Sequence, residues 1–179
     1  MRMPWALPTV LTLALAGAAG GTTIVPADLD TLTREARAIA RGRVAAIEPH
    51  PAAEGGIETL VSLEVVAYLK GSLGARVQFR VPGGQLGRVR HIVVGAPEFA
   101  VGQDVIVFLG ARTPGEPYLV GFSQGVFRLA ATSAGWVVTP PVLASAPAGS
   151  LLRRGDPARR PVPLADFERE VRARVDVVR

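Results

Sequence analysis

The segment Gly121–Gly125 has the residue types of a serine-hydrolase nucleophile elbow. It reads Gly-Phe-Ser-Gln-Gly, which matches the G-x-S-x-G pattern of α/β-hydrolases. In those enzymes the serine lies on a sharp turn from a strand into a helix, and the catalytic histidine follows it in the chain. Here a strand-like segment, Val126–Leu129, follows Ser123, and both histidines, His50 and His91, precede it. We therefore predict a glycine-flanked hairpin turn, and a small secreted hydrolase that uses Ser123 is the alternative.

The remaining acid and base residues do not have the spacing of a metal site or a catalytic set. His50 and His91 are 41 residues apart, and the chain contains no cysteine for thiolate chemistry, zinc or disulfides. Glu64, Glu98 and Asp104 could converge in the folded protein, which would give the hydrolase alternative a carboxylate cluster, but their spacing does not require it. We predict no catalytic residue, no metal and no cofactor.

The glycine-rich segment Pro82–Gly87 resembles a phosphate-binding loop only loosely. It lacks the Gly-Lys-Ser/Thr ending of such a loop and precedes no predicted helix whose N-terminus could hold an anion. We interpret it as the start of an exposed loop. If a partner binds this protein, we expect it to contact the loop at Gly83, Gly84, Gln85, Arg88 and Arg90.

Short strands at regular intervals must position these residues. The clearest is Ile57–Leu69, where apolar residues alternate with polar ones, and Val77–Val81 follows it as the second half of a hairpin. Glycines and prolines separate the other predicted strands, which are Arg43–Glu48, Val89–Val94, Val105–Leu109, Tyr118–Phe122, Val126–Leu129 and Trp136–Thr139. This pattern is typical of a small sandwich or barrel, and we predict Val89–Val94 and Val105–Leu109 as central barrel strands.

One helix is predicted on each side of these strands. Asp28 can cap a helix with an apolar stripe at Leu29, Leu32, Ala36 and Ile39, ending near 40–42. Residues 163–178 place apolar side chains at helical spacing, so we expect an amphipathic helix that docks on its own barrel or on a partner. Residues 140–162, rich in proline, alanine, glycine and arginine, are predicted to be a linker or loop.

Residues 1–20 have the layout of a cleaved secretory signal peptide. Arg2 precedes a short apolar run, and Ala16-Gly17-Ala18 offers small residues for cleavage within 16–21. No later run is long and apolar enough to span a membrane. We expect the mature chain in the periplasm or outside the cell.

The charge of the chain does not single out nucleic acid as a partner. The net charge is +5, but the arginines are scattered and interleaved with acids, and aromatic residues make up only 6% of the chain. Base-stacking surfaces need aromatic side chains over a basic groove. An OB-type nucleic-acid binder therefore stays an alternative, and our prediction is no nucleic acid.

Several segments resemble a group of exported bacterial proteins without assigned activity. The resemblance lies in residues 32–44, 59–71, 81–84 and 96–109, within a region from Leu29 to Leu129. The architecture of that group is similar to the OB-like barrel of netrin-like domains and of tissue inhibitors of metalloproteinases. Those inhibitors use an N-terminal cysteine and disulfides, which this chain lacks, so the resemblance implies the barrel and not that mechanism.

We predict a mainly β protein with a small OB-like or Greek-key barrel, an N-terminal helix and a C-terminal amphipathic helix. Residues 26–139 form the helix and barrel domain, after the signal peptide and before the linker and last helix. The expected function is an exported, non-catalytic module that binds another exported protein, as an accessory or inhibitor-like partner of an extracellular protease.

Overall fold

A computed structural model describes residues 27–112, 116–141 and 160–177. The predicted signal peptide and most of the predicted linker lie outside these ranges. The helices are α1 (Leu29–Glu35) and α2 (Leu164–Val177), and η1 (Phe122–Gly125) is a short 3₁₀ helix. The strands are β1 (Ala38–Pro51), β2 (Ile57–Lys70), β3 (Arg76–Pro82), β4 (Gly84–Leu86), β5 (Val89–His91), β6 (Asp104–Arg112), β7 (Glu116–Leu119), β8 (Val126–Thr132), β9 (Gly135–Thr139) and β10 (Val162–Pro163).

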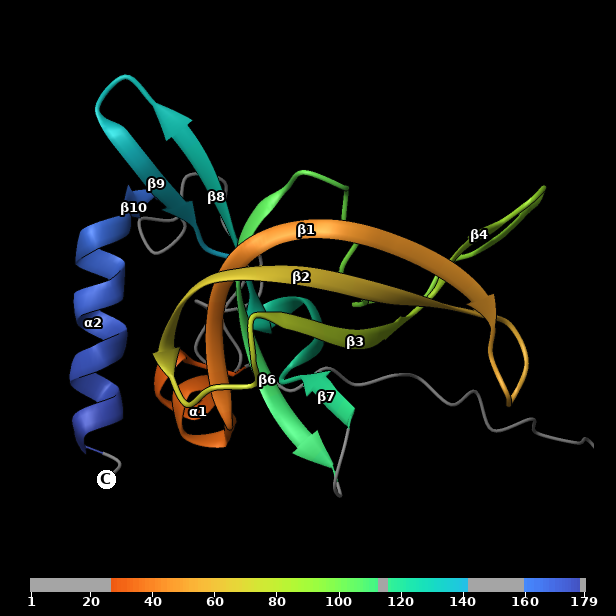
Figure 1. The fold of residues 1–179 in the computed structure, drawn as a ribbon, viewed down its shortest axis with the longest axis horizontal. Coiled ribbons are helices and arrows are strands. Elements are labelled where there is room, and N and C mark those ends of the chain that lie inside the picture. The colour runs from red at the N-terminus through yellow and green to blue at the C-terminus, as the bar shows by residue number, and fades with distance from the viewer. Residues whose placement is uncertain (1–26, 113–115, 142–159, 178–179) are drawn as a thin grey trace, which may run out of the picture.

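Five strands close into a barrel in the order β1, β2, β3, β7, β6 and back to β1 (Figure 1). The pairing of β3 with β7 is parallel and the other pairings are antiparallel. This is the strand order of a five-stranded OB-like barrel, which confirms the predicted fold class.

The long strand β1 closes the barrel because it pairs on both edges. It runs antiparallel to β2 over its whole length and to β6 over Ala38–Arg43. Three irregularities in the β1–β2 register bend the strand so that it can serve both neighbours. Gly42 lies at one of them, and a side chain there would collide with the main-chain oxygen of Glu64.

The first helix is shorter than the sequence predicts, and β1 begins earlier. The helix ends at Glu35 instead of near residues 40–42, and Arg37 N donates to Leu109 O at 2.8 Å. Ala38, Ile39 and Ala40 are fully buried between β2 and β6, so pairing with two strands outweighs the helical pattern. The apolar stripe marks three buried residues and the half-buried Leu29, but its last residue, Ile39, belongs to a strand.

The predicted strand Val89–Val94 is not part of the barrel. Only Val89–His91 is a strand, and it pairs with β4 in a separate two-stranded sheet. Val89, Ile92 and Val94 are exposed, so the apolar pattern that suggested a buried strand lies on a projecting hairpin (Figure 1). The prediction of two central barrel strands within 81–110 holds only for β6.

The segment Gly121–Gly125 is also not a hairpin turn. Strands β7 and β8 pair one after the other with β6 and run in the same direction, with Leu119 opposite Leu109 and Val126 opposite Val107. The segment is therefore a short excursion within one edge, and it folds as η1 after Gly121 in the left-handed conformation.

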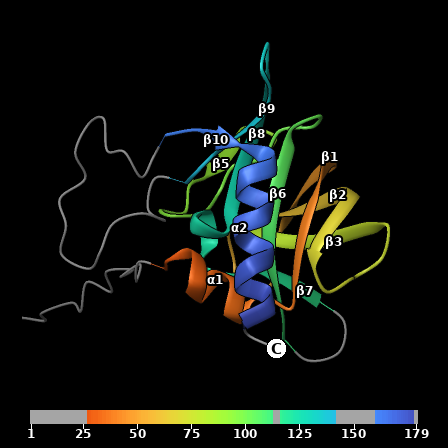
Figure 2. The same cartoon turned by 90° about the vertical axis from the view of Figure 1, so that its left-hand side faces the viewer.

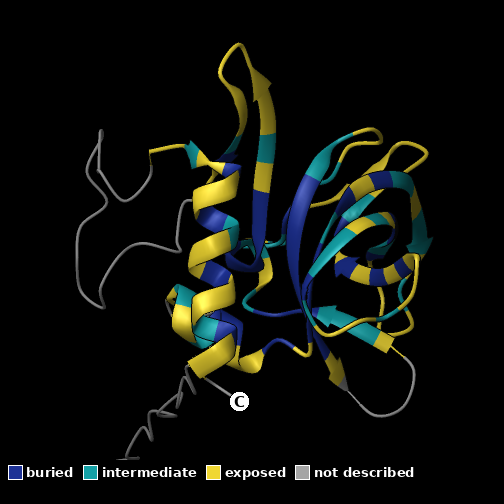
Figure 3. Ribbon diagram, turned by 60° about the vertical axis from the view of Figure 1, so that its left-hand side comes forward, coloured by how far each residue is buried: buried dark blue, intermediate teal, exposed yellow. Residues whose placement is uncertain are grey.

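The helix α2 packs on the molecule's own sheet, outside the barrel (Figure 2). Its buried stripe faces the strands and its exposed face is turned to solvent (Figure 3). Phe167 lies with its ring centroid 4.8 Å from that of Phe127, which in turn lies 5.4 Å from Phe108 of β6. These rings join α2 to the outside of the barrel, whose interior is filled by a second cluster that includes Val61, Leu63 and Phe79.

Both ends of α1 are satisfied by side chains. Asp28 Oδ1 accepts from Thr31 N at 2.8 Å, and this backbone hydrogen bond lowers the pKa of the Asp28 carboxyl. Lys70 Nζ donates to Thr33 O at 2.6 Å near the C-terminal end, and partial burial lowers the pKa of this ammonium group.

Replacing Phe167 with alanine should lower the free energy of unfolding by about 3–5 kcal/mol, because it leaves a cavity between α2 and the sheet. Denaturant unfolding followed by circular dichroism measures the change. The control is Arg169→Ala on the exposed face, where an ion pair with Asp166 is worth less than about 1 kcal/mol. Equal losses in the two variants would contradict the docking of α2.

The Asp28 cap should be sensitive to acid. Since its folded pKa is lowered, its stabilisation is present above the unfolded value of 3.8 and is lost as the pH falls through the folded value. Asp28→Ala should cost about 1 kcal/mol at neutral pH and less at about pH 2. Asp28→Asn keeps an acceptor oxygen and is the matched control. The free energy of unfolding of both variants is measured across this pH range, and equal losses in Asp28→Asn and Asp28→Ala would contradict the capping role of Asp28.

Candidate functional site: the β4–β5 hairpin and its groove

Two glycines let the chain leave the barrel at the end of β3. Gly83 and Gly84 have φ angles of 92° and 141°, which other residues rarely adopt. A side chain on Gly84 would also collide with Thr59 Oγ1, and one on Gly83 would approach His91 O at 3.0 Å. The chain therefore passes close over the start of β2 and then turns outward into β4.

The base of this hairpin is hydrogen-bonded to β2. Thr59 Oγ1 donates to Gly83 O at 2.7 Å, and Gly83 N donates to Ile57 O at 2.8 Å. From the other hairpin strand, His91 Nδ1 accepts from Ile57 N at 3.0 Å, which assigns the ring proton to Nε2 in the neutral form. Thus β4 and β5 are both fixed to the start of β2, and His91 has a structural partner.

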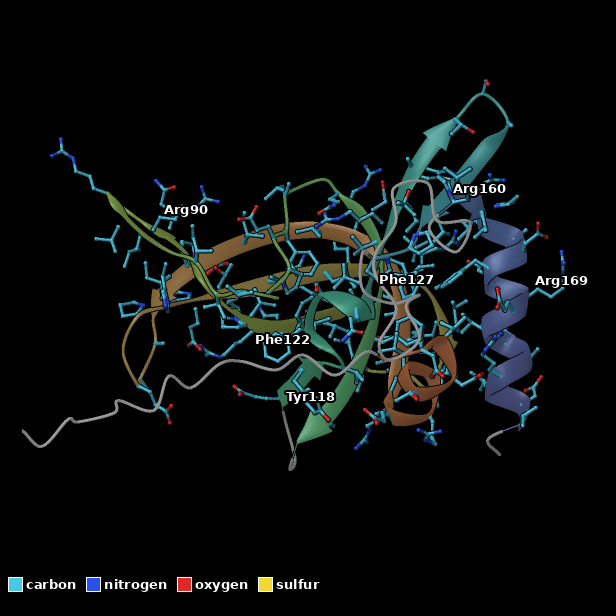
Figure 4. The ribbon with its side chains drawn as sticks, turned by 180° about the vertical axis from the view of Figure 1, so that it is seen from behind. Arg90, Tyr118, Phe122, Phe127, Arg160 and Arg169 are labelled. Carbon is cyan, nitrogen blue, oxygen red and sulfur yellow. The ribbon has the colours of Figure 1, made fainter. Side chains whose placement is uncertain are left out.

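The outer part of the hairpin carries apolar side chains that the barrel does not cover. Leu86 and Val89 face each other across the two-residue loop Gly87–Arg88, and they are 43% and 64% exposed. Ile92 and Val94, in the segment that returns to the barrel, are 70% and 78% exposed. We call these four side chains, Leu86, Val89, Ile92 and Val94, the apolar rim. Figure 4 shows the hairpin extending from the barrel, with the Arg90 side chain on it.

A groove of about 510 Å³ lies beside the hairpin. Its walls come from Ile47 and Pro49 of β1, Thr59 of β2, the hairpin, and the segment Ala96–Phe99. Arg90 Nη2 and Glu98 Oε1 form an ion pair at 2.8 Å between two of these walls, and both side chains are exposed. The groove thus has mixed polar and apolar walls that one exposed ion pair bridges.

The structure brings four of the five predicted contact residues to this groove. Gly83, Gly84, Gln85 and Arg90 line it, whereas Arg88 lies in the loop at the hairpin tip. The two glycines shape the backbone, so the side chains available to a partner are those of Gln85, Arg88 and Arg90. Whether a partner contacts them stays a prediction.

The residues considered for catalysis lie in different places. Ser123 is on η1, where its main-chain N donates to Gly95 O at 3.2 Å, while His91 is hydrogen-bonded to β2. The three carboxylates form separate ion pairs, Glu64 with Arg76, Glu98 with Arg90, and Asp104 with Arg43. The last pair, by hydrogen bonding and charge, raises the pKa of Arg43. Within the described ranges, no three acidic or histidine side chains form a group that could hold a metal.

The apolar rim was missed in the sequence because three of its residues, Val89, Ile92 and Val94, suit a buried strand equally well. One signal was available, since Gly87–Arg88 between Leu86 and Val89 has the length of a two-residue hairpin loop. Phe122 was missed too: it is 45% exposed and has a φ of 54°, an uncommon conformation for an aromatic residue.

Comparison with known proteins assigns the chain to no family. No family model matches it, and neither does any curated protein sequence. In the part of the chain that the structure describes, no helix has the length and apolar character needed to cross a membrane.

Replacing Gly84 with alanine should loosen the hairpin and leave the barrel folded, because the new methyl group collides with Thr59 in a strained backbone. Gly87→Ala is the control, since Gly87 also has a positive φ but has open space around it. Hydrogen exchange should show lost protection at the hairpin base in Gly84→Ala. In the control, backbone strain should lower the free energy of unfolding by only about 1–2 kcal/mol. Unchanged exchange in Gly84→Ala would contradict the close approach to β2.

Proposed function

We propose that the protein is an exported, non-catalytic module that binds another exported protein through the β4–β5 hairpin. The observation that carries this proposal is the apolar rim, four branched side chains exposed on or next to the hairpin, of which Ile92 lines the groove. Exposed apolar patches with polar borders mark interaction sites in soluble proteins. The hairpin base supports such a role because Thr59 and His91 hold it in place before a partner arrives.

The energetics of burial favour a partner that covers the rim. Complete burial of a valine, leucine or isoleucine side chain contributes about 1.5–3 kcal/mol, so a few such contacts suffice for measurable affinity. The four side chains of the apolar rim lie outside both core clusters and therefore contribute nothing to the barrel core. Their exposure therefore serves binding better than it serves folding.

The barrel face supports a protein partner over a nucleic acid. OB-folds bind oligonucleotides on the face of their strands 2 and 3, and here Arg43 lies on β1, which adjoins β2, with Arg76 and Arg80 on β3. Each of them pairs with a carboxylate, namely Asp104, Glu64 and Glu58 respectively. Phosphates would have to compete with these carboxylates for the arginines.

The specific form of the proposal is an accessory or inhibitor-like partner of an extracellular protease. Its support is the closed five-stranded OB-like barrel, together with the resemblance of the sequence to proteins whose architecture is similar to netrin-like domains and metalloproteinase inhibitors. Because this chain lacks the cysteine of those inhibitors, the hairpin would have to make the contact. Inhibition assays of co-exported proteases with the pure protein test this form directly.

Charge in the apolar rim should weaken partner binding. Partners are captured from culture medium and identified, and their affinities are then measured for the wild type, Val89→Glu and Val66→Glu. Val66 is a matched control because it is 67% exposed on β2. We expect Val89→Glu to weaken binding at least tenfold, which corresponds to about 1.4 kcal/mol, while Val66→Glu leaves it unchanged.

Replacement of Gln85 or Arg88 should change binding and spare folding, because both side chains are exposed. Thermal unfolding provides the check on folding. Equal binding losses in Val89→Glu and Val66→Glu, or unfolding of the Gln85 or Arg88 variants, would defeat the proposal.

A further inference from the structure

We propose that the hairpin recognises its partner by strand addition, in which an extended acidic and apolar segment pairs with the free edge of β5. This inference rests on the proposed function and specifies how the partner is read. Strand addition uses main-chain hydrogen bonds for affinity and alternate side chains for specificity.

The free edge belongs to β5 because β4 is the strand nearer the barrel. Strand β4 packs against β1 and β2, and Gly84 lies against Thr59 and Pro49. Strand β5 packs mainly on β4, and among the described residues no third strand joins this sheet. Residues Arg90–Val93 line the groove, so the edge of β5 borders the space that a segment would occupy.

The register of the hairpin shows which main-chain groups are available. A two-residue loop is closed by a hydrogen-bonded pair, here Leu86 and Val89, so the next pair, Gln85 and Arg90, is not hydrogen-bonded. The N–H and C=O groups of Arg90 therefore point away from β4. An added strand would lie about 4.8 Å from β5 and pair with these groups.

The side chains around this edge define the chemistry of the segment. Ile92 and Val94 of the apolar rim follow β5 and are exposed, so apolar side chains of the segment can cover them. At the tip, Arg88 makes no ion pair or hydrogen bond with any described residue, which leaves its charge for an incoming carboxylate. Arg90 already has Glu98, so the acidic residue belongs near the tip.

An anionic membrane is the competing class of partner, since it also attracts arginines and apolar side chains. One feature favours the segment: the binding surface includes a groove rather than only a projecting tip.

The test uses the full exported chain and the peptide acetyl-Asp-Val-Thr-Val-Thr-Val-amide. One control peptide carries lysine in place of aspartate, and another is N-methylated at alternate residues so that it cannot pair as a strand. Hydrogen exchange of the Arg90 and Ile92 amides and titration calorimetry provide the readouts.

We expect the aspartate peptide to slow exchange at Arg90, to bind at least tenfold more tightly than either control, and to lose that advantage over the lysine peptide in Arg88→Glu. No protection at Arg90, or equal binding of the N-methylated peptide, would overturn strand addition. Binding of the chain to anionic phospholipid vesicles, with no binding of the peptide, would also overturn it in favour of a membrane.

The outcome of this test can be distinguished from the outcome of the test of the proposed function. If Val89→Glu abolishes binding of a captured partner while the peptide gives no protection, the binding module stands and strand addition falls. If Val89→Glu leaves partner binding intact, the proposed function itself falls.

Discussion

The fold depends on the closure of the barrel by the long strand β1. Strand β1 joins β2 to β6 and thereby turns an open sheet into a barrel. This requires burial of its first residues, a close approach at Gly42 and a bend that its register irregularities supply. With the ring closed, the barrel leaves few main-chain groups to pair with another chain.

The β4–β5 hairpin, like β8, β9 and β10, lies outside the closed ring, and its position follows from local chemistry. Gly83 and Gly84 release the chain from the barrel, and the hydrogen bonds of Thr59 and His91 hold the released segment against β2. The molecule thus has a closed barrel and, outside it, a hairpin whose strand edge is unpaired and whose orientation is fixed. Opposite charges on the barrel wall are matched in register, because Asp104, Arg43, Glu64 and Arg76 lie side by side on four neighbouring strands.

The sequence predicted well the strands that have one buried face and one exposed face. Alternation in β3 is complete, with Val77, Phe79 and Val81 buried and the residues between them exposed, so a two-residue period was sufficient. The start of β1 could not be predicted in this way, because Ala36 and Ile39 suit a helix stripe and a doubly buried strand equally well. The pairing partner that decides between them, β6, lies more than sixty residues away in the chain.

The glycines in the sequence indicated where the candidate site lies, but they did not predict its exposed apolar side chains. The segment from Gly83 to Arg88 was correctly placed outside the barrel, whereas Val89–Val94 was assigned to a barrel strand. Hydrophobic character alone does not reveal whether a strand faces a core or a partner. The excursion at Gly121–Gly125 shows the same limit, since a local motif cannot show that the strands on either side run in one direction.

The seams of the barrel are unequal, and this has a consequence for its assembly. Strands β3 and β7 meet at a single register pair, Arg80 and Tyr118, whereas the other seams join several pairs. Closing a long loop costs chain entropy, and the pairing of one residue pair offsets little of that cost. We expect the ring to close between β3 and β7 last during folding and to open there first. Local opening of the native barrel should therefore occur mainly between these two strands.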